Sequence, residues 1–397
     1  MRKRSLLILS LLVVTAVLTA CGPKEIECAD EWGCAVFEPG MTVKVAYVGP
    51  MTGPYSAFGT DISRGAQLAV KANPDVEGFA FELLIEDTQG QSEQSATVAN
   101  KLAADPQVVA VAGHTFSGST LTAIPIYQEA GIPMMSPSTT LASFTAMGTD
   151  VYNRVAFSDA IQAREAAAYL FNVLGVTKIV TVHDSDAYGK GLAEGVAAEF
   201  EALGGEVLDI KATTQGSADY SAPLADIAAL EPELIYYGGY DADAALMVTQ
   251  MAAAGLDGVI FFGCDGTYGT NFIDLAGDDA EGAYSTNVPI PPSDAFDTFK
   301  ADYEAEFGEP QGKLSPYSPH GHDAALVLLA AIDRTAVKSG NTLVIGRKAL
   351  ADEIRRTDGL TGLTTSSITC ADNGECGPQD LVFMLAEGGE WGEAPGQ

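Results

Sequence analysis

Short apolar runs alternate with amphipathic stretches along most of the chain. The apolar run TVKVAYVGP, residues 42–50, precedes TDISRGAQLAVKAN, residues 60–73, in which apolar positions recur at helical spacing. The same order recurs along the chain, in residues 79–105, 108–131, 178–204 and 234–265. Near-continuous apolar runs are typical of parallel strands that are covered on both faces. Strands that alternate with helices predict an α/β fold built on doubly wound parallel sheets.

The length and the interruptions of this pattern predict two lobes. A chain of 397 residues exceeds one ordinary domain. The alternation falters at residues 151–160, at 282–294 and at 359–370, which we interpret as three crossovers between lobes. We expect an N-terminal lobe of residues 42–158 and 288–365, and a C-terminal lobe of residues 159–287 and 366–392.

The first residues carry the features of an export signal. Basic residues 2–4 precede an apolar stretch that is short for a membrane-spanning helix. The segment that follows, LTACG, resembles the lipobox of bacterial lipoproteins, in which the cysteine is lipidated and becomes the new N-terminus. We therefore expect residues 1–20 to be a signal peptide, Cys21 to carry the lipid, and residues 21–41 to tether the folded body to a membrane.

The remaining cysteines form two pairs and one single residue. Cys28 and Cys34 are separated by five residues in a polar segment, and so are Cys370 and Cys376. In an exported protein this spacing predicts two local disulfides. The alternative is a four-thiolate zinc site, although this spacing is unusual for zinc. Cys264 is left over, and we expect it to be a buried free thiol.

The charge of the chain narrows the class of partner. The sequence holds 53 acidic and 21 basic residues, which gives a net charge of −32. A nucleic-acid-binding protein needs a basic surface, so this class is disfavoured. We interpret the acidic excess as charge that keeps the protein soluble.

Hydroxyl residues and glycines follow the apolar run in VVAVAGHTFSGST, residues 108–120. One explanation is that Ser117 or a neighbour caps a helix. The other is that the free N–H groups of the helix start bind an anion. Ligands of parallel α/β sheets bind at the carboxyl ends of the strands. The predicted strand ends carry hydroxyls, glycines and aromatic rings but no lysine, arginine or phosphate-binding fingerprint, which disfavours a phosphate ligand.

Eight motifs in order resemble one known family, the periplasmic binding proteins for leucine, isoleucine and valine. They are VAYVGPMTGP, DISRGAQLAV, LIEDTQ, VAGHTFSGST, GIPMMSPSTT, VHDSDAYGKGL, LIYYGGYDAD and AEGAYSTN. The resemblance implies two α/β lobes joined by three crossovers, with a ligand cleft that closes by a hinge. It also implies an amino-acid ligand, delivery to the permease subunits of an ABC transporter, no cofactor and no catalysis.

The resemblance carries the family's polar ligand contacts onto this chain. Ser117 matches a serine that binds the ligand carboxylate, and Ser138 and Thr140 match the hydroxyl-rich turn that shares this task. Asp265 matches an acid that pairs with the ligand ammonium, although branched-chain binders often have glutamate there. The chemistry is consistent, because an amino acid needs donors around its carboxylate and one acid near its ammonium.

Four aromatic residues match positions around the ligand in the same family. Tyr188 and Tyr240 match residues of the second lobe that cover the ligand on closure. Phe58 matches a lining position, and Tyr55 is a further candidate. The shorter Asp265 leaves the side-chain specificity open, and other amino acids, amides, urea or small amino compounds remain alternatives.

Other classes of function have weaker support. Ser117 lacks the turn on which hydrolases place an activated serine, so we expect no enzyme. His320 and His322 form an H-x-H pair, but they precede a helical run and are interpreted as helix-start residues rather than metal ligands. We expect a monomer. A sensor subunit that presents its ligand to a membrane receptor is the alternative to transport.

Overall fold

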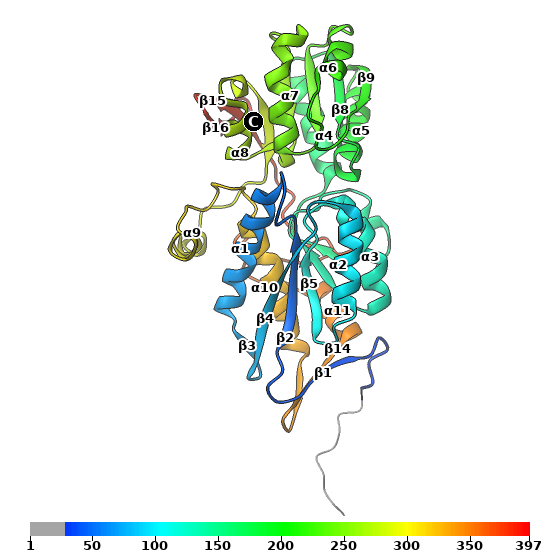
Figure 1. Ribbon diagram of the computed structural model, residues 1–397, viewed down its shortest axis with the longest axis vertical. Helices are drawn as coiled ribbons and strands as arrows, with labels where there is room; N and C mark the ends of the chain where they lie inside the picture. Colours follow the sequence, from blue (N-terminus) through cyan, green and yellow to red (C-terminus); the bar gives the residue numbers. More distant parts are fainter. Residues whose placement is uncertain (1–27) are drawn as a thin grey trace, which may run out of the picture.

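The computed structural model describes residues 28–397, which form two α/β lobes joined by crossing segments (Figure 1). The predicted signal peptide and Cys21 lie outside the described residues. Within the described range, no helix is both long and apolar enough to cross a membrane. The prediction of two lobes with parallel sheets and flanking helices is confirmed.

The first lobe is built on a six-stranded sheet in the order β3-β4-β2-β5-β6-β7. All neighbouring pairs are parallel except β3 with β4. Every residue of β5 is buried, as the apolar run VVAVAG predicts. The strands are β2 (Val43–Gly49), β3 (Asp75–Val76), β4 (Phe79–Asp87), β5 (Val108–Gly113), β6 (Met134–Ser136) and β7 (Tyr152–Arg154).

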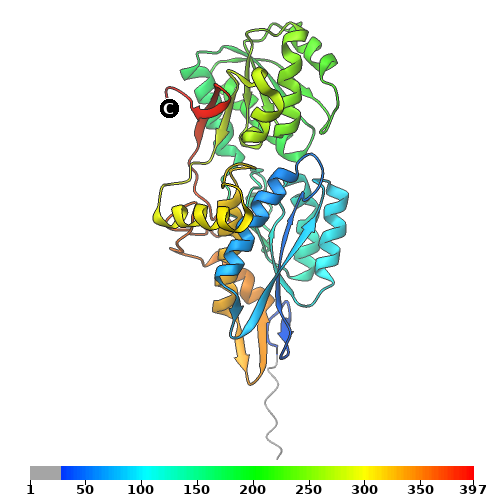
Figure 2. The same cartoon turned by 60° about the vertical axis from the view of Figure 1, so that its left-hand side comes forward.

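The second lobe holds a seven-stranded sheet in the order β16-β15-β12-β11-β10-β8-β9. Its strands are β8 (Lys178–His183), β9 (Glu206–Ala212), β10 (Leu234–Gly238), β11 (Ile260–Gly263), β12 (Tyr284–Asn287), β15 (Val382–Glu387) and β16 (Glu390–Glu393). The antiparallel pairs in this sheet are β12 with β15 and β15 with β16. Strands β15 and β16 return from the far end of the chain and join the upper lobe in Figure 2.

Helices cover both sheets. Those of the second lobe are α4 (Asp159–Ala168), α5 (Ala187–Ala202), α6 (Ser221–Ala228), α7 (Asp241–Met251) and α8 (Thr270–Ala276). Those on the side of the first lobe are α1 (Ser56–Ala72), α2 (Ser92–Ala103), α3 (Ser117–Ala130), α9 (Asp294–Phe307), α10 (Ser318–Thr335) and α11 (Arg347–Arg355).

Helices α1 and α10 pack closely enough that glycine is required between them. A Cβ atom on Gly65 of α1 would lie 1.9 Å from the carbonyl oxygen of Ser318. The buried carboxylate of Asp61 joins the same helices, because it accepts hydrogen bonds from the backbone N–H of Ser318 at 2.7 Å and from the hydroxyl of Ser315 at 2.8 Å. This contact fixes the beginnings of both helices, which lead to the space between the lobes.

Part of the predicted tether is folded into the first lobe. Strand β1 (Cys34–Phe37) pairs antiparallel with β14 (Thr342–Gly346), which pairs with β13 (Val337–Ser339). The side chain of Phe37 is fully buried. The predicted tether, residues 21–41, is therefore wrong for β1, because an apolar side chain in this polar segment completes a hydrophobic core.

The three crossovers link β7 to α4, β12 to α9, and the end of the first lobe to β15 (Figure 1). The segment before β15 belongs with the first lobe, since the backbone N–H of Cys370 donates to Thr357 and that of Cys376 donates to Arg154. These contacts favour a third boundary at residues 377–381 rather than at 365. The disulfides Cys28–Cys34 and Cys370–Cys376 and the buried free Cys264 are confirmed.

Candidate ligand-binding site

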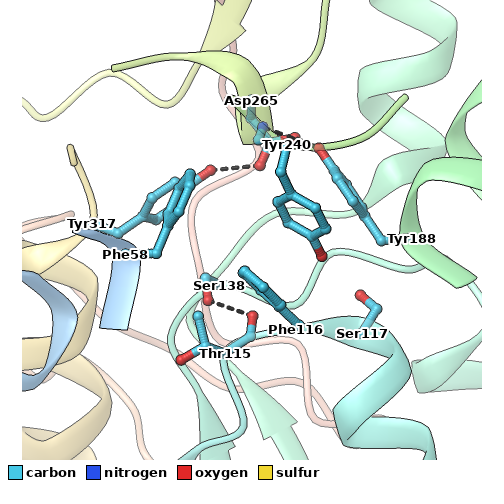
Figure 3. A pocket seen from close by; sticks show the side chains of 10 residues that line it. Phe58, Thr115, Phe116, Ser117, Ser138, Tyr188, Tyr240, Asp265 and Tyr317 are labelled. Atoms are coloured by element: carbon cyan, nitrogen blue, oxygen red, sulfur yellow. Dashed lines mark hydrogen bonds between the residues drawn. The ribbon is translucent and has the colours of Figure 1, made fainter. Parts of the chain in front are cut away.

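A small cavity lies between the two lobes (Figure 3). Its walls come from the segments that follow strands of both sheets and from the beginnings of α1, α3, α5, α7 and α10. The lining residues are Phe58, Thr115, Phe116, Ser117, Ser138, Tyr188, Tyr240, Asp265, Gly266 and Tyr317. The side chains leave little free space in this cavity, so it suits a small ligand.

The first-lobe wall presents hydroxyl groups and the start of a helix. Ser117 is the first residue of α3, and the N-cap position belongs to Phe116, which makes no side-chain capping bond within the described chain. The capping explanation for Ser117 is therefore wrong, because the helix begins at this residue rather than after it. The hydroxyl of Ser138 donates to the backbone oxygen of Thr115 at 2.8 Å. This wall offers donors to an anionic group without adding positive side chains.

The second-lobe wall presents one carboxylate, that of Asp265, whose residue is only 4% exposed. Its Oδ1 accepts hydrogen bonds from the Tyr188 hydroxyl and from Nε2 of Gln162, both at 2.6 Å. Its Oδ2 accepts from the Tyr317 hydroxyl at 2.5 Å. Burial raises the pKa of Asp265, while these donors act to lower it. Three neutral donors thus hold a buried acid against the cavity.

Aromatic rings from both lobes surround this acid. Phe116 of the first lobe stacks on Tyr240 of the second with ring centroids 4.1 Å apart. Tyr188 lies 5.4 Å from Tyr240, and Phe58 lies 6.2 Å from it. In Figure 3 the Phe116 and Tyr240 rings lie between the hydroxyl wall and the acid. Contact between rings of opposite lobes shows that the structure is a closed form.

The structure brings six of the eight predicted contact residues to the cavity. These are Phe58, Ser117, Ser138, Tyr188, Tyr240 and Asp265. Tyr55 lies outside the lining, where its ring contacts Phe116 at 5.7 Å. Thr140 is fully buried away from it, and its hydroxyl has no hydrogen-bond partner among the described residues. That any of these residues binds a ligand stays a prediction.

Sequence reasoning missed four lining residues and one supporting residue. The lining residues are Thr115, Phe116, Gly266 and Tyr317. Phe116 and Gly266 adjoin residues that were selected, so the strand-end signal located them within one position. Tyr317 precedes α10, and Gln162 lies inside α4, so neither follows a strand. The feature that could have identified them is their polarity, because a polar group in an otherwise apolar helical segment needs a hydrogen-bond partner in the interior.

Asp159, at the start of α4, is a second buried acid near the site. It is 3% exposed, and neither of its carboxylate oxygens has a hydrogen-bond partner among the described residues. Burial, and then the charge of Asp265, raise the pKa of Asp159 to about 8. The raised pKa favours the protonated form of Asp159 at neutral pH, and this form adds no negative charge beside the cavity.

The histidines of the H-x-H pair, His320 and His322, lie in the first turns of α10. His320 is buried, and burial lowers its pKa to about 4. Nδ1 of His322 lies 3.0 Å from Oδ1 of Asp323. Residues 28–397 contain no group of three or more side chains arranged to hold a metal ion. These positions agree with helix-start residues.

The family model for periplasmic binding proteins matches residues 42–390. The chain belongs to this family. The match covers both lobes and all three crossovers. It explains why the cavity of this periplasmic binding protein lies where strand ends of both sheets face one another.

Among similar proteins, the "Leu/Ile/Val-binding protein homolog 1" of Brucella abortus is 34% identical over 248 residues, which cover 62% of this chain and 66% of that protein. An "amino acid binding protein" of Pseudomonas aeruginosa is 34% identical over 217 residues, 54% of this chain and 58% of that protein. The matches thus span about three fifths to two thirds of these relatives' length.

Solved structures share the fold. The leucine-binding protein LivK of Thermotoga maritima superposes with a TM-score of 0.80 at 29% identity, covering 89% of this chain and 98% of that chain. The branched-chain amino-acid binding protein LivJ of Streptococcus pneumoniae, solved with isoleucine, has a TM-score of 0.76 at 24% identity, covering 88% and 97%.

Proposed function

We propose that this periplasmic binding protein captures a small amino-acid-like zwitterion between its lobes and delivers it to the permease of an ABC transporter. The observation that carries the proposal is the polarity of the cavity. Hydroxyls and the start of α3 line one wall, and the carboxylate of Asp265 lines the other. A zwitterion places its carboxylate at the first wall and its positive nitrogen at the second.

The two lobes contact different ends of the ligand. In the open form, the hydroxyl of Ser117 and the N–H groups at the start of α3 receive the ligand carboxylate, because the Ser138 hydroxyl already donates to Thr115. Closure then adds Tyr188, Tyr240 and Asp265, which bury the positive end. The mechanism is binding by lobe closure, with no bond made or broken, and the closed form is what the permease recognises.

We further propose that the protein works outside the cytoplasm as a monomer, held to the membrane by a lipid on Cys21. The export signal and the lipobox-like segment support this location, and the folded body beginning near Cys28 leaves a short connection to the lipid. Labelling with a fatty-acid analogue, compared with the Cys21→Ala variant, tests the anchor. An unlabelled wild-type protein would contradict it.

A thermal-shift screen of the purified mature protein tests the ligand class. The panel contains amino acids, N-methylated amino acids, amides, urea and small carboxylates. A ligand that binds only the folded form raises the melting temperature. We expect shifts from compounds that carry both a carboxylate and a positive nitrogen. Shifts from plain carboxylates or urea alone would contradict the proposal.

A further inference from the structure

The hydrogen bonds around Asp265 indicate which kind of nitrogen the ligand carries. This inference rests on the function proposed above. A carboxylate offers about four lone-pair positions. Tyr188, Gln162 and Tyr317 occupy three of them in the closed form, two on Oδ1 and one on Oδ2. Roughly one position remains for a ligand.

A primary ammonium is poorly matched to this acid. Its three N–H groups each need an acceptor once water is excluded, and a buried donor without one is costly. Asp265 can satisfy about one of them, which leaves the others to neutral hydroxyl oxygens such as those of Tyr240 and Tyr317. The hydroxyl of Ser138 is already committed as a donor to Thr115, on the opposite wall. A methylated ammonium avoids this cost, since each methyl group replaces an N–H that would need a partner.

Aromatic rings from both lobes surround Asp265 and suit a methylated cation. Phe58, Tyr188, Tyr240 and Tyr317 line the cavity around Asp265, and neither lysine nor arginine is among its described lining residues. The faces of aromatic rings attract cations, and cages of aromatic rings are a known way to bind quaternary ammonium groups. Methyl groups also bury apolar surface against the rings, which a primary ammonium does not.

We propose that the ligand is a small carboxylate whose nitrogen is methylated, as a tertiary or quaternary ammonium. Ser117 and the start of α3 hold the carboxylate. The rings enclose the methyl groups, and Asp265 supplies the balancing charge through space rather than through several hydrogen bonds. The small cavity limits the ligand to a short carbon skeleton.

Isothermal titration of the mature protein with one methylation series tests the proposal. The probes are glycine, N-methylglycine, N,N-dimethylglycine and N,N,N-trimethylglycine, with leucine, isoleucine and valine alongside. We expect affinity to rise along the series, with the trimethylated compound at least about tenfold tighter than glycine and tighter than leucine. Tighter binding of a primary amino acid would overturn this inference and leave the proposed function standing. No binding of any zwitterion would overturn both.

A conservative variant tests the hydrogen-bond argument. Tyr317→Phe keeps the ring but frees the position on Oδ2 of Asp265 that its hydroxyl occupies. We expect the preference for trimethylglycine over glycine to fall by about threefold or more, because a second lone-pair position becomes available to N–H groups. A general loss of closure affects both ligands equally and leaves this ratio unchanged.

The matched control is Tyr303→Phe. The Tyr303 hydroxyl also donates to a buried carboxylate, Oδ1 of Asp61 at 2.8 Å, but neither residue lines the cavity. This variant should keep the wild-type ratio. An unchanged ratio in Tyr317→Phe would show that occupied lone pairs do not set the preference, and would overturn the inference.

Discussion

The hydroxyl of Tyr55 in the first lobe donates a hydrogen bond of 2.8 Å to Oδ2 of Asp243 in the second lobe. Both residues are buried, and the same carboxylate also accepts from the backbone N–H of Gly216. Tyr55 was expected to line the ligand cavity. It instead links the lobes beside the cavity, and we propose that this link stabilises closure.

Removing this link should weaken ligand binding without altering the cavity wall. We expect Tyr55→Phe to destabilise the closed form by about 1.5–3 kcal/mol, the range for a hydrogen bond to a charged group. The dissociation constant of the bound ligand should therefore rise roughly 10- to 150-fold. Titration calorimetry measures the change. Tyr169→Phe is the control, because the Tyr169 hydroxyl bonds Pro395 within the second lobe. Equal affinities in the wild type and Tyr55→Phe would remove the closure role.

The charge of Asp265 should matter more than its shape. Asp265→Asn keeps the size of the side chain but removes the negative charge, which leaves the ligand's positive nitrogen buried without a counter-charge. We expect the affinity for the zwitterion to fall by about 2–5 kcal/mol. Asp241→Asn is the control, since Asp241 is a buried acid of the same lobe that pairs with Asn271 outside the cavity. Similar losses in both variants would show a structural effect rather than a ligand contact.

Buried acids should make the fold less stable as pH rises. Asp159 and Asp184 have pKa values raised to about 8, against 3.8 for an exposed aspartate. Between these values the folded state holds more protons than the unfolded state, so the free energy of unfolding falls as pH increases from about 4 to about 8. The contribution of each acid is greatest below pH 4 and is lost as pH passes about 8.

The variant Asp159→Asn isolates one of these protons. Denaturation in urea measures the free energy of unfolding at pH 5 and at pH 8. Between these pH values we expect this free energy to fall by about 2–4 kcal/mol more in the wild type than in the variant. Repulsion among the surface acids acts equally on both proteins and cancels in the comparison. The same loss in both proteins would mean that Asp159 is ionised in the folded state.

The disulfide Cys370–Cys376 should stabilise the third crossover. Closing its short loop is expected to contribute about 2 kcal/mol, and Glu375 within the loop forms an ion pair with the buried Arg154. Replacing both cysteines with serine should speed hydrogen exchange at residues 370–377. The matched control replaces Cys28 and Cys34, which lie beside β1 in the first lobe. Unchanged exchange at the crossover would contradict the role.

The sequence predicts the architecture well because its strands are covered on both faces. Runs such as VVAVAG contain no polar residue, so they predict a fully buried strand, and β5 is buried throughout. The tether was predicted less well. Phe37 ends the short run CAVF between polar residues, and only the pairing of this run with β14, far along the chain, makes it part of a core.

The candidate site was predictable where it follows strands and not elsewhere. Ser117 and Asp265 follow β5 and β11 directly, so the strand-end rule finds them. Tyr317 reaches the cavity only because α10 packs against α1, which is a contact between distant segments. Thr140 was selected for its hydroxyl, but the turn after β6 directs it into the interior, which the sequence does not reveal.

The most direct test compares three forms of one small carbon skeleton by calorimetry with the wild-type protein. The first carries a carboxylate and a positive nitrogen, the second lacks the nitrogen, and the third has its carboxylate converted to an ester. We predict that only the first binds, because each wall of the cavity satisfies one charge of the ligand. Equal binding of the form without nitrogen would contradict the role of Asp265 and the account of the site.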